Sequence, residues 1–122
     1  MINKRVFCNA EDIIITMVLG DTMSFNFSIK GLGGTASQIL FTCREKLGTF
    51  DYIFMKALND GVSLISYDEA TDEAIYCVRV NPADTVELTP ALYYYDLALI
   101  NNGDRLTLLR GRLNLIYSVL NY

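Results

Sequence analysis

The chain has 122 residues, 52% of them apolar and 20% charged, so it is long enough and apolar enough to bury a hydrophobic core. Its formal net charge of -4 argues against an extended phosphate-binding surface, and we do not expect nucleic acid as a partner. The sequence contains no histidine, which removes the Ser-His-Asp and Cys-His nucleophile arrangements and most catalytic zinc sites. We therefore expect no catalytic, cofactor-binding or metal-binding residues and no enzyme activity.

The three cysteines, Cys8, Cys43 and Cys77, are widely separated, and no Cys-x-x-Cys pair occurs. This pattern favours buried free thiols in a reducing compartment such as the bacterial cytoplasm, with one disulfide and a leftover thiol as the alternative. The apolar run at residues 13–19 is short and follows two acidic residues, so no secretion signal is expected. No apolar run reaches the length of about 18 residues that a transmembrane helix needs.

Residue patterns in the first part of the chain predict strands at residues 12–19, 22–30 and 37–46, the second of which alternates between apolar and polar residues. Residues 12–19 are apolar on both faces, which is typical of a central strand. The glycine-rich stretch Gly31–Gly34 predicts a flexible connection. A phosphate loop is the alternative, but the Lys and Ser/Thr of a P-loop do not follow it.

The middle of the chain contains one ambiguous segment and one hairpin. Residues 50–58 fit either a helical stripe or an aromatic strand, and the neighbouring strands favour a strand. Asn59-Asp60-Gly61 predicts a turn. Strands at 62–67 and 74–80 are expected to flank the acidic segment 68–73. Its four carboxylates predict a solvated turn; a calcium loop is the alternative, although the spacing does not match an EF-hand.

The stretch from Asp84 to Leu99 is the one around which the rest of the chain is expected to be organised. Its first part predicts a helical turn with an Asp84-Thr85 N-cap, and a strand should begin just after Pro90, which cannot donate to a sheet ladder. On that strand, one face carries Tyr93, Tyr95, Leu97 and Leu99, and the other carries Tyr94, Asp96 and Ala98. The residues expected to build the corner are Asp84, Thr85, Leu88, Pro90, Tyr93 and Tyr95.

The end of the chain predicts a further hairpin. The Asn-Gly pair within residues 101–104 is a strong hairpin signal, and strands are expected at 105–110 and 112–119, joined at a bulge at Gly111. Together the predicted segments make about eight or nine short strands separated by turn signals. This pattern predicts an all-β antiparallel sandwich or closed barrel. The only helix allowed for is one short turn near 82–90. We expect a single domain spanning residues 1–122.

Carboxylates and tyrosines supply the remaining candidate sites. Asp21, Asp84 and Asp96 could in principle form a carboxylate pair that acts on sugars, but turn or corner chemistry explains the first two. Asp96 is expected to face outward and pair with Arg110 or Arg112 across the hairpin. A run of three tyrosines could stack on sugars, but such runs more often place rings in the core and at an interface. The interface residues we predict are Tyr94, Tyr117 and Tyr122.

Two motifs carry a family resemblance. The first is the run Asp84-Thr85-x-x-Leu88-x-Pro90-x-x-Tyr93-x-Tyr95-Asp96-Leu97, and the second is the following Thr107-Leu-Leu-x-Gly111 hairpin segment. Their order resembles the small β-sandwich domains of tailed bacteriophages and prophages that are related to the N-terminal domain of the baseplate upper protein (the BppU-like family). Ala91 departs from the family pattern, which usually has Gly after the proline. The corner is also similar to the Leu-x-Pro…Tyr feature of fibronectin type III domains, in which a tyrosine hydroxyl binds backbone.

The resemblance implies an immunoglobulin-like sandwich that serves as a non-catalytic assembly or adaptor part of a phage tail, baseplate or fibre. Its partners would be other phage structural proteins or further copies of the chain, with no membrane and no small-molecule substrate. The expected location is the bacterial host cytoplasm during assembly and then the virion. The alternative function is a small carbohydrate- or ligand-binding module, which predicts a concave site lined by tyrosines and carboxylates.

Overall fold

The computed structural model describes residues 2–5, 11–48 and 50–118, and these form ten strands and one short helix. The strands of the first half are β1 (Ile2–Arg5), β2 (Glu11–Asp12), β3 (Ile15–Val18), β4 (Met23–Lys30), β5 (Gln38–Arg44) and β6 (Phe54–Leu58). The second half contains β7 (Gly61–Asp68), β8 (Glu73–Val80), α1 (Pro82–Thr85), β9 (Ala91–Asn101) and β10 (Asp104–Ile116).

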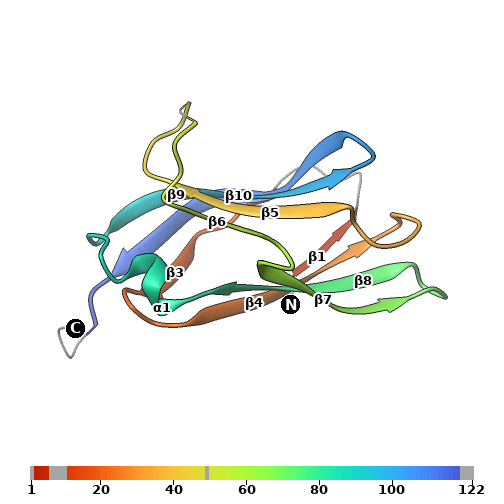
Figure 1. Cartoon of the computed structure of the whole chain (residues 1–122), viewed down its shortest axis with the longest axis horizontal. Coiled ribbons are helices and arrows are strands. Elements are labelled where there is room, and N and C mark those ends of the chain that lie inside the picture. The colour runs from red at the N-terminus through yellow and green to blue at the C-terminus, as the bar shows by residue number, and fades with distance from the viewer. Residues whose placement is uncertain (1, 6–10, 49, 119–122) are drawn as a thin grey trace.

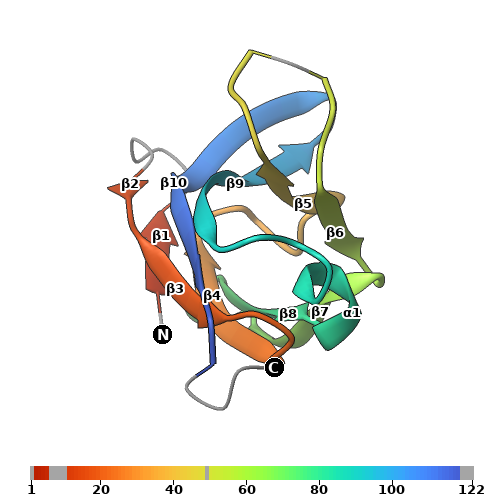
Figure 2. The same cartoon turned by 90° about the vertical axis from the view of Figure 1, so that its left-hand side faces the viewer.

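The strands pack as two layers (Figures 1 and 2). Neighbouring strands follow the order β1-β4-β8-β7-β6-β5-β9-β10-β2, and β3 also pairs with β10. One layer is β1-β4-β8-β7, and the other is β6-β5-β9-β10 with β2 and β3 at its edge. This order corresponds to the A-B-E-D and C′-C-F-G sheets of immunoglobulin-like domains. The protein is therefore an all-β, immunoglobulin-like sandwich, as the sequence resemblance implies, whereas the strand pattern alone also allowed a closed barrel.

The two layers are joined at one side by a short pairing between β6 and β7. Only Ala57↔Gly61 and Leu58↔Val62 pair there, in parallel orientation. Three other pairings, β1 with β4, β10 with β2 and β10 with β3, are also parallel, so the expectation of an antiparallel sandwich holds only for the main strands. The parallel pairs arise where chain segments cross from one layer to the other without an intervening hairpin.

Aromatic rings fill the space between the layers. Phe27 of β4 stacks on Tyr76 of β8 with ring centroids 5.5 Å apart, and Phe41 of β5 lies 5.5 Å from the Tyr95 ring of β9. All four side chains are buried. Burying a large apolar side chain contributes about 1.5–3 kcal/mol relative to leaving it exposed, so these rings carry much of the stability of the sandwich.

The strand predicted at residues 12–19 is interrupted and lies at an edge rather than in the centre. Among the described residues, its two halves, β2 and β3, pair only with β10, and Ile14 between them is exposed. Gly111 of β10 permits this path: a Cβ at this position would overlap the Ile13 carbonyl oxygen, so glycine lets the Ile13 backbone lie against β10. The segment is apolar because it covers the core from the edge of the layer. The periodicity of the sequence alone does not distinguish such an edge strand from a central strand.

Three other expectations are refined by the structure. The ambiguous segment 50–58 is a loop followed by β6, so its second half is a strand. The two strands expected after residue 104 form one continuous β10, and its bulge lies between Thr107 and Leu109 rather than at Gly111. The Asn-Gly hairpin is confirmed, because Asn102 and Gly103 both have positive φ, of 53° and 86°. Two consecutive positive φ values are the requirement of a type I′ turn.

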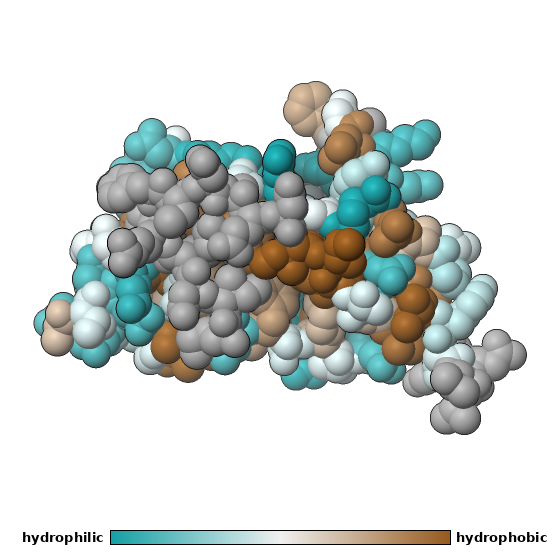
Figure 3. Space-filling view, turned by 180° about the vertical axis from the view of Figure 1, so that it is seen from behind, coloured by the Kyte–Doolittle hydropathy of each residue, from teal (hydrophilic) through white to brown (hydrophobic). Residues whose placement is uncertain are grey.

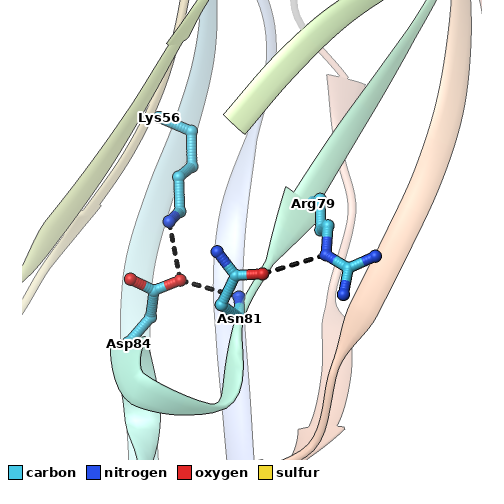
Figure 4. Close-up of polar contacts among 4 residues, drawn as sticks. All are labelled: Lys56, Arg79, Asn81 and Asp84. Atoms are coloured by element: carbon cyan, nitrogen blue, oxygen red, sulfur yellow. Dashed lines mark hydrogen bonds and ion pairs between the residues drawn. The ribbon is translucent and has the colours of Figure 1, made fainter. Parts of the chain in front are cut away.

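The helical corner begins earlier than predicted. The N-cap of α1 is Asn81, and Asp84 is the third helical residue rather than the N-cap. Its Oδ2 atom accepts a hydrogen bond of 2.7 Å from the Asn81 backbone N–H and also lies 2.7 Å from Lys56 Nζ (Figure 4). Pro82 follows Asn81 as the first helical residue, where its missing N–H costs nothing. The carboxylate of Asp84, the third helical residue, therefore caps the N-terminus of α1 by accepting the Asn81 N–H.

The remaining corner residues anchor neighbouring segments. The Tyr93 hydroxyl donates to the Thr89 carbonyl oxygen at 2.7 Å, which is the tyrosine corner that the sequence resemblance predicts. The buried Thr85 Oγ1 accepts from the Gly20 N–H at 3.0 Å, and this bond ties the turn after β3 to the corner. Leu88 packs against the core. β9 begins at Ala91, directly after Pro90, as predicted.

Candidate functional site

A hollow of about 610 Å³ lies on the outer face of β9 and β10. Its floor is formed by strand residues, one wall is formed by Ile13 and Ile14 between β2 and β3, and Leu47 from the loop after β5 lines it as well. The residues that line it are Ile13, Ile14, Leu47, Tyr94, Tyr95, Asp96, Thr107, Arg110, Gly111 and Arg112. This volume falls in the range typical of ligand pockets, about 300–1,000 Å³.

The first wall exists because two contacts hold the chain between β2 and β3 against the sheet. The Ile13 N–H donates to the Arg110 carbonyl oxygen at 3.0 Å, and the Tyr95 hydroxyl donates to the Ile13 carbonyl oxygen at 2.7 Å. Ile13 is therefore fixed by its backbone, while the neighbouring Ile14 side chain is 67% exposed. An apolar side chain presented on a fixed backbone loses little conformational freedom when a partner covers it.

On the floor of the hollow, Arg112 stacks on Tyr94. The guanidinium carbon of Arg112 lies 4.0 Å from the centroid of the Tyr94 ring, a cation–π contact. The same guanidinium donates to two carbonyl oxygens of β9, to that of Leu92 at 2.7 Å and to that of Tyr93 at 3.3 Å. The guanidinium group of Arg112 is thus held in one orientation in the unbound protein.

Asp96 occupies the floor between the arginines. It faces outward as predicted, and Arg110 is its partner in the strand register, but the ion pair that the structure shows is with Arg105, at 3.6 Å between Nη2 and Oδ1. That Oδ1 atom is buried and has no hydrogen-bond partner within the described residues. The Arg105 guanidinium is therefore the positive charge that the structure places beside this oxygen.

A second charged feature lies at the β7–β8 turn, where the sequence predicts an acidic hairpin. Asp72 is the residue that organises it: the Tyr67 hydroxyl donates to Asp72 Oδ1 and the Gly33 N–H donates to Asp72 Oδ2, both at 2.8 Å. These hydrogen bonds, with that from Tyr67 first, lower the pKa of Asp72 and keep it ionised. The Gly31–Gly34 stretch is thus fixed to the hairpin by a contact that the sequence analysis missed.

The same turn is braced internally and presents negative charge. Asp68 Oδ1 accepts from the Ala70 N–H at 2.9 Å, and Glu73 lies 3.7 Å from Lys30. Asp68 and Glu69 are exposed. The acidic hairpin, defined as residues 68–73, therefore carries four carboxylates on a turn of defined shape. Within the described residues, no group of three or more Cys, Asp or Glu side chains is arranged to hold a metal ion.

Apolar side chains gather on part of the surface, as Figure 3 shows for the side opposite Figure 1. The most exposed are Phe50 at 99%, Leu47 at 68% and Ile14 at 67%. Leu47 and Phe50 lie on the loop between β5 and β6, which projects away from both layers (Figure 1). Exposed apolar side chains that are grouped rather than scattered are typical of surfaces that bind other molecules.

Two of the three tyrosines predicted as an interface, Tyr94 and Tyr117, lie at different points along the β9–β10 pair. Tyr94 lies on the floor of the hollow, half-buried under Arg112. Tyr117 is 64% exposed and follows the last residue of β10, five positions beyond Arg112, the register partner of Tyr94. Tyr122 lies outside the described residues. The alternation of side chains along β9 predicted that Tyr94 faces outward. No sequence motif marks Leu47 or Ile14, and the fold alone brings these two residues to the hollow.

Neither of the two described cysteines lines this hollow. Cys43 and Cys77 are free thiols, and burial raises the pKa of Cys43 to about 12. Cys8 lies outside the described residues. In the part of the chain that the structure describes, no helix has the length and apolar character needed to cross a membrane.

Comparison with known proteins shows no family to which this chain belongs. No family model matches the sequence, and no curated protein matches it. One similar solved structure comes from a photo-crosslinking study of the multimeric cell-adhesive interactions of VGSC beta subunits. It is 11% identical, with 88% of this chain and 93% of that chain covered, at a TM-score of 0.45. The assignment to the immunoglobulin-like sandwiches accordingly rests on the strand order and the tyrosine corner described above.

Proposed function

We propose that this protein is a non-catalytic structural or adaptor component of a phage or prophage tail, baseplate or fibre, and that it binds other proteins through the outer face of β9 and β10. The observation that carries the binding role is the hollow on that face, whose lining includes the exposed apolar residues Ile14 and Leu47 and the oriented Arg112. Interfaces combine such apolar contacts with arginine and tyrosine anchors.

Two features of the sequence support the remaining parts of this proposal. The resemblance through the Asp84–Leu97 run and the following hairpin supports the phage assignment. The lack of histidine supports a role without acid–base catalysis near neutral pH.

The binding role is tested with the purified chain and the tail and baseplate proteins encoded beside its gene, by surface plasmon resonance. We expect one of them to bind, and Leu47→Asp to weaken that binding by about tenfold or more because it places a charge in an apolar contact. The matched control is Leu64→Asp, which changes an exposed leucine of β7 in the other layer. Failure of all these proteins to bind, or an equal loss for both variants, would overturn the proposal.

A second function is favoured by the shape of the same hollow. A carbohydrate- or small-ligand-binding module requires a concave site with tyrosine and carboxylate groups, and Tyr94, Tyr95 and Asp96 line this one. The test is a glycan array followed by titration of any hit against Tyr94→Ala and Asp96→Asn. Binding that both variants abolish would establish this function. An array without hits would remove it.

A further inference from the structure

Four polar side chains meet where β6 lies beside the corner that follows β8 (Figure 4). Lys56 is the most enclosed of them: it is 9% exposed, and its stem packs so closely on Gly61 that a Cβ there would lie 2.5 Å from Lys56 Cδ. A confined stem holds its amine against the groups at its tip, which favours reaction with them over reaction with solvent. The groups around Lys56 Nζ therefore decide what this amine does.

One oxygen of Asp84 holds this amine next to Asn81. Asp84 Oδ2 lies 2.7 Å from Lys56 Nζ and accepts a hydrogen bond, also of 2.7 Å, from the Asn81 backbone N–H. Asn81 is the N-cap of α1, and the nitrogen of its carboxamide points toward the side on which Lys56 and Asp84 lie (Figure 4). An amine, a carboxylate and a carboxamide therefore share one largely enclosed site.

Arg79 binds the other end of the same carboxamide. Its Nε–H donates to Asn81 Oδ1 at 2.9 Å. A cationic donor on a carbonyl oxygen stabilises the negative charge that forms on that oxygen when a nucleophile adds to the carbonyl carbon. Because Oδ1 faces Arg79, the nitrogen that would leave is turned toward the Lys56–Asp84 pair. The carboxamide of Asn81 is thus both polarised and oriented for attack by an amine.

We propose that Lys56 and Asn81 form an intramolecular isopeptide bond, with Asp84 as the acid–base group that moves the protons and Arg79 as the group that stabilises the oxygen charge. The structure shows the four side chains before this reaction, with the lysine still an amine. The inference concerns a modification of the chain itself and does not depend on the proposed binding role.

The reaction exchanges one amide for another. A proton first passes from Lys56 Nζ to Asp84 Oδ2, which gives a neutral amine and a carboxylic acid, and burial favours this neutral pair over the ion pair. The amine adds to Asn81 Cγ, and the oxygen charge forms on the atom that Arg79 binds. Asp84 then gives its proton to the carboxamide nitrogen and takes one from the attacking nitrogen. The Cγ–Nδ2 bond breaks, the new Nζ–Cγ bond remains, and one ammonia leaves.

The bond joins the two layers of the sandwich. Lys56 lies on β6 in one layer, and Asn81 directly follows β8 in the other. Within the described residues, the strand pairing between these layers on this side is limited to Ala57↔Gly61 and Leu58↔Val62. A covalent link between distant positions restricts the unfolded chain and so stabilises the folded one. The crosslink therefore reinforces the side at which the layers pair least.

Mass spectrometry of the full chain under denaturing conditions tests the bond. We expect an intact mass lower than that of the sequence by one ammonia, and digestion should release a branched peptide in which the Lys56 side chain is joined to Asn81. The branched peptide is decisive, because Asn102 before Gly103 also loses one ammonia when it closes to a succinimide. Recovery of Lys56 and Asn81 in separate peptides would overturn the inference. A Lys56–Asp84 link formed with loss of water would overturn it as well.

Two conservative variants should abolish the branched peptide. Lys56→Arg retains the positive charge beside Asp84, but a guanidinium stays protonated and is not a nucleophile. Asn81→Ser retains an N-cap residue without a carboxamide. It also retains the Lys56–Asp84 pair, so its lower urea midpoint relative to the parent chain measures the effect of the bond alone. A matched control is Lys30→Arg at the more exposed pair with Glu73, which should leave the branched peptide unchanged.

Two further variants test the assigned roles through the rate of bond formation, measured in timed samples of cell-free synthesis. Asp84→Ala should slow it by about 100-fold, because no group then moves the protons. Arg79→Gln should slow it by about tenfold, because the donor on Oδ1 loses its charge. An unchanged rate in Asp84→Ala would overturn the mechanism. None of these outcomes bears on binding by the outer face of β9 and β10, so the proposed function is tested separately.

Discussion

Lys56 Nζ lies 2.7 Å from Asp84 Oδ2, and this ion pair joins β6 to the corner between β8 and β9. The two side chains are only 11% and 18% exposed. Gly61 makes the contact possible, because a Cβ there would lie 2.5 Å from Lys56 Cδ. The lysine is therefore enclosed between the start of β7 and the first turn of α1 (Figure 4).

Lys56→Met is expected to reduce the free energy of unfolding by about 2–4 kcal/mol, because it leaves the Asp84 carboxylate without its cation in a site that is largely closed to water. Urea unfolding followed by circular dichroism measures this change. The control is Lys30→Met, which breaks a more exposed pair of 3.7 Å and should cost at most about 0.5 kcal/mol. Equal effects of the two substitutions would show that burial does not strengthen the Lys56–Asp84 pair.

Tyr76→Phe should destabilise the sandwich by about 1–3 kcal/mol. The Tyr76 hydroxyl accepts a hydrogen bond of 2.8 Å from the buried Ala36 N–H, and phenylalanine would leave that donor without a partner. Chemical denaturation measures the loss. The exposed Tyr52→Phe is the control and should change the stability little. An unchanged unfolding midpoint for Tyr76→Phe would mean that water reaches the Ala36 amide.

Gly111→Ala should displace the segment between β2 and β3, because the new methyl group would overlap the Ile13 carbonyl oxygen. The expected cost is about 1–3 kcal/mol. Gly34→Ala is a matched control: Gly34 has a φ of 148° against 158° for Gly111, but no atom lies within 4 Å of its Cβ position. Hydrogen exchange of the Ile13 amide should accelerate in the first variant only. The same protection in both would contradict the close packing of Ile13 on Gly111.

The lowered pKa of Asp72 predicts that the stability of the protein depends on pH in the acidic range. Its pKa is lowered below the usual 3.8, chiefly by the hydrogen bond from the Tyr67 hydroxyl, so the folded state favours the ionised form. The stabilisation is complete above the usual pKa and is lost as the pH falls through the lowered value. Asp72→Asn should therefore flatten the decline of stability below about pH 4. Urea midpoints across that range test it, and Tyr67→Phe should flatten the decline in the same direction.

Cys43 should react far more slowly with iodoacetamide than Cys77 does in the folded protein. Its side chain is buried and burial raises its pKa to about 12, so almost no thiolate is present near pH 8. Cys77 is only partly buried. Peptide mass spectrometry after timed alkylation measures both rates, and urea should remove the difference. Rapid labelling of Cys43 without denaturant would show that the strand around it opens readily.

Local signals predicted much of this fold. The alternation of residues 22–30 matches β4, and the Asn-Gly pair matches the turn between β9 and β10, because both depend on side chains near one another in sequence. The N-cap of the helical corner was predicted at Asp84 but lies at Asn81. The sequence itself carries this N-cap pattern, with Pro82 directly after Asn81 and Asp84 three residues after it.

Other features depend on residues distant in sequence and were not predictable. The path of the chain at Ile13 is permitted by Gly111, and the acidic hairpin is held to the Gly31–Gly34 stretch by the hydrogen bond from Gly33. The floor of the candidate site was partly predicted, since Tyr94, Asp96 and Arg112 face outward on adjacent strands. Its walls were not, because Ile14 and Leu47 come from loops whose course is set by the packing of both layers.

Tyr95 stands two residues after the corner tyrosine, where antibody domains carry the second cysteine of their inter-sheet disulfide. Here a ring contact with Phe41 and a hydroxyl bond to Ile13 occupy that place. Neither contact needs an oxidant to form or is broken by a reductant. The joining of these segments at this position is consequently independent of the redox state of the surroundings.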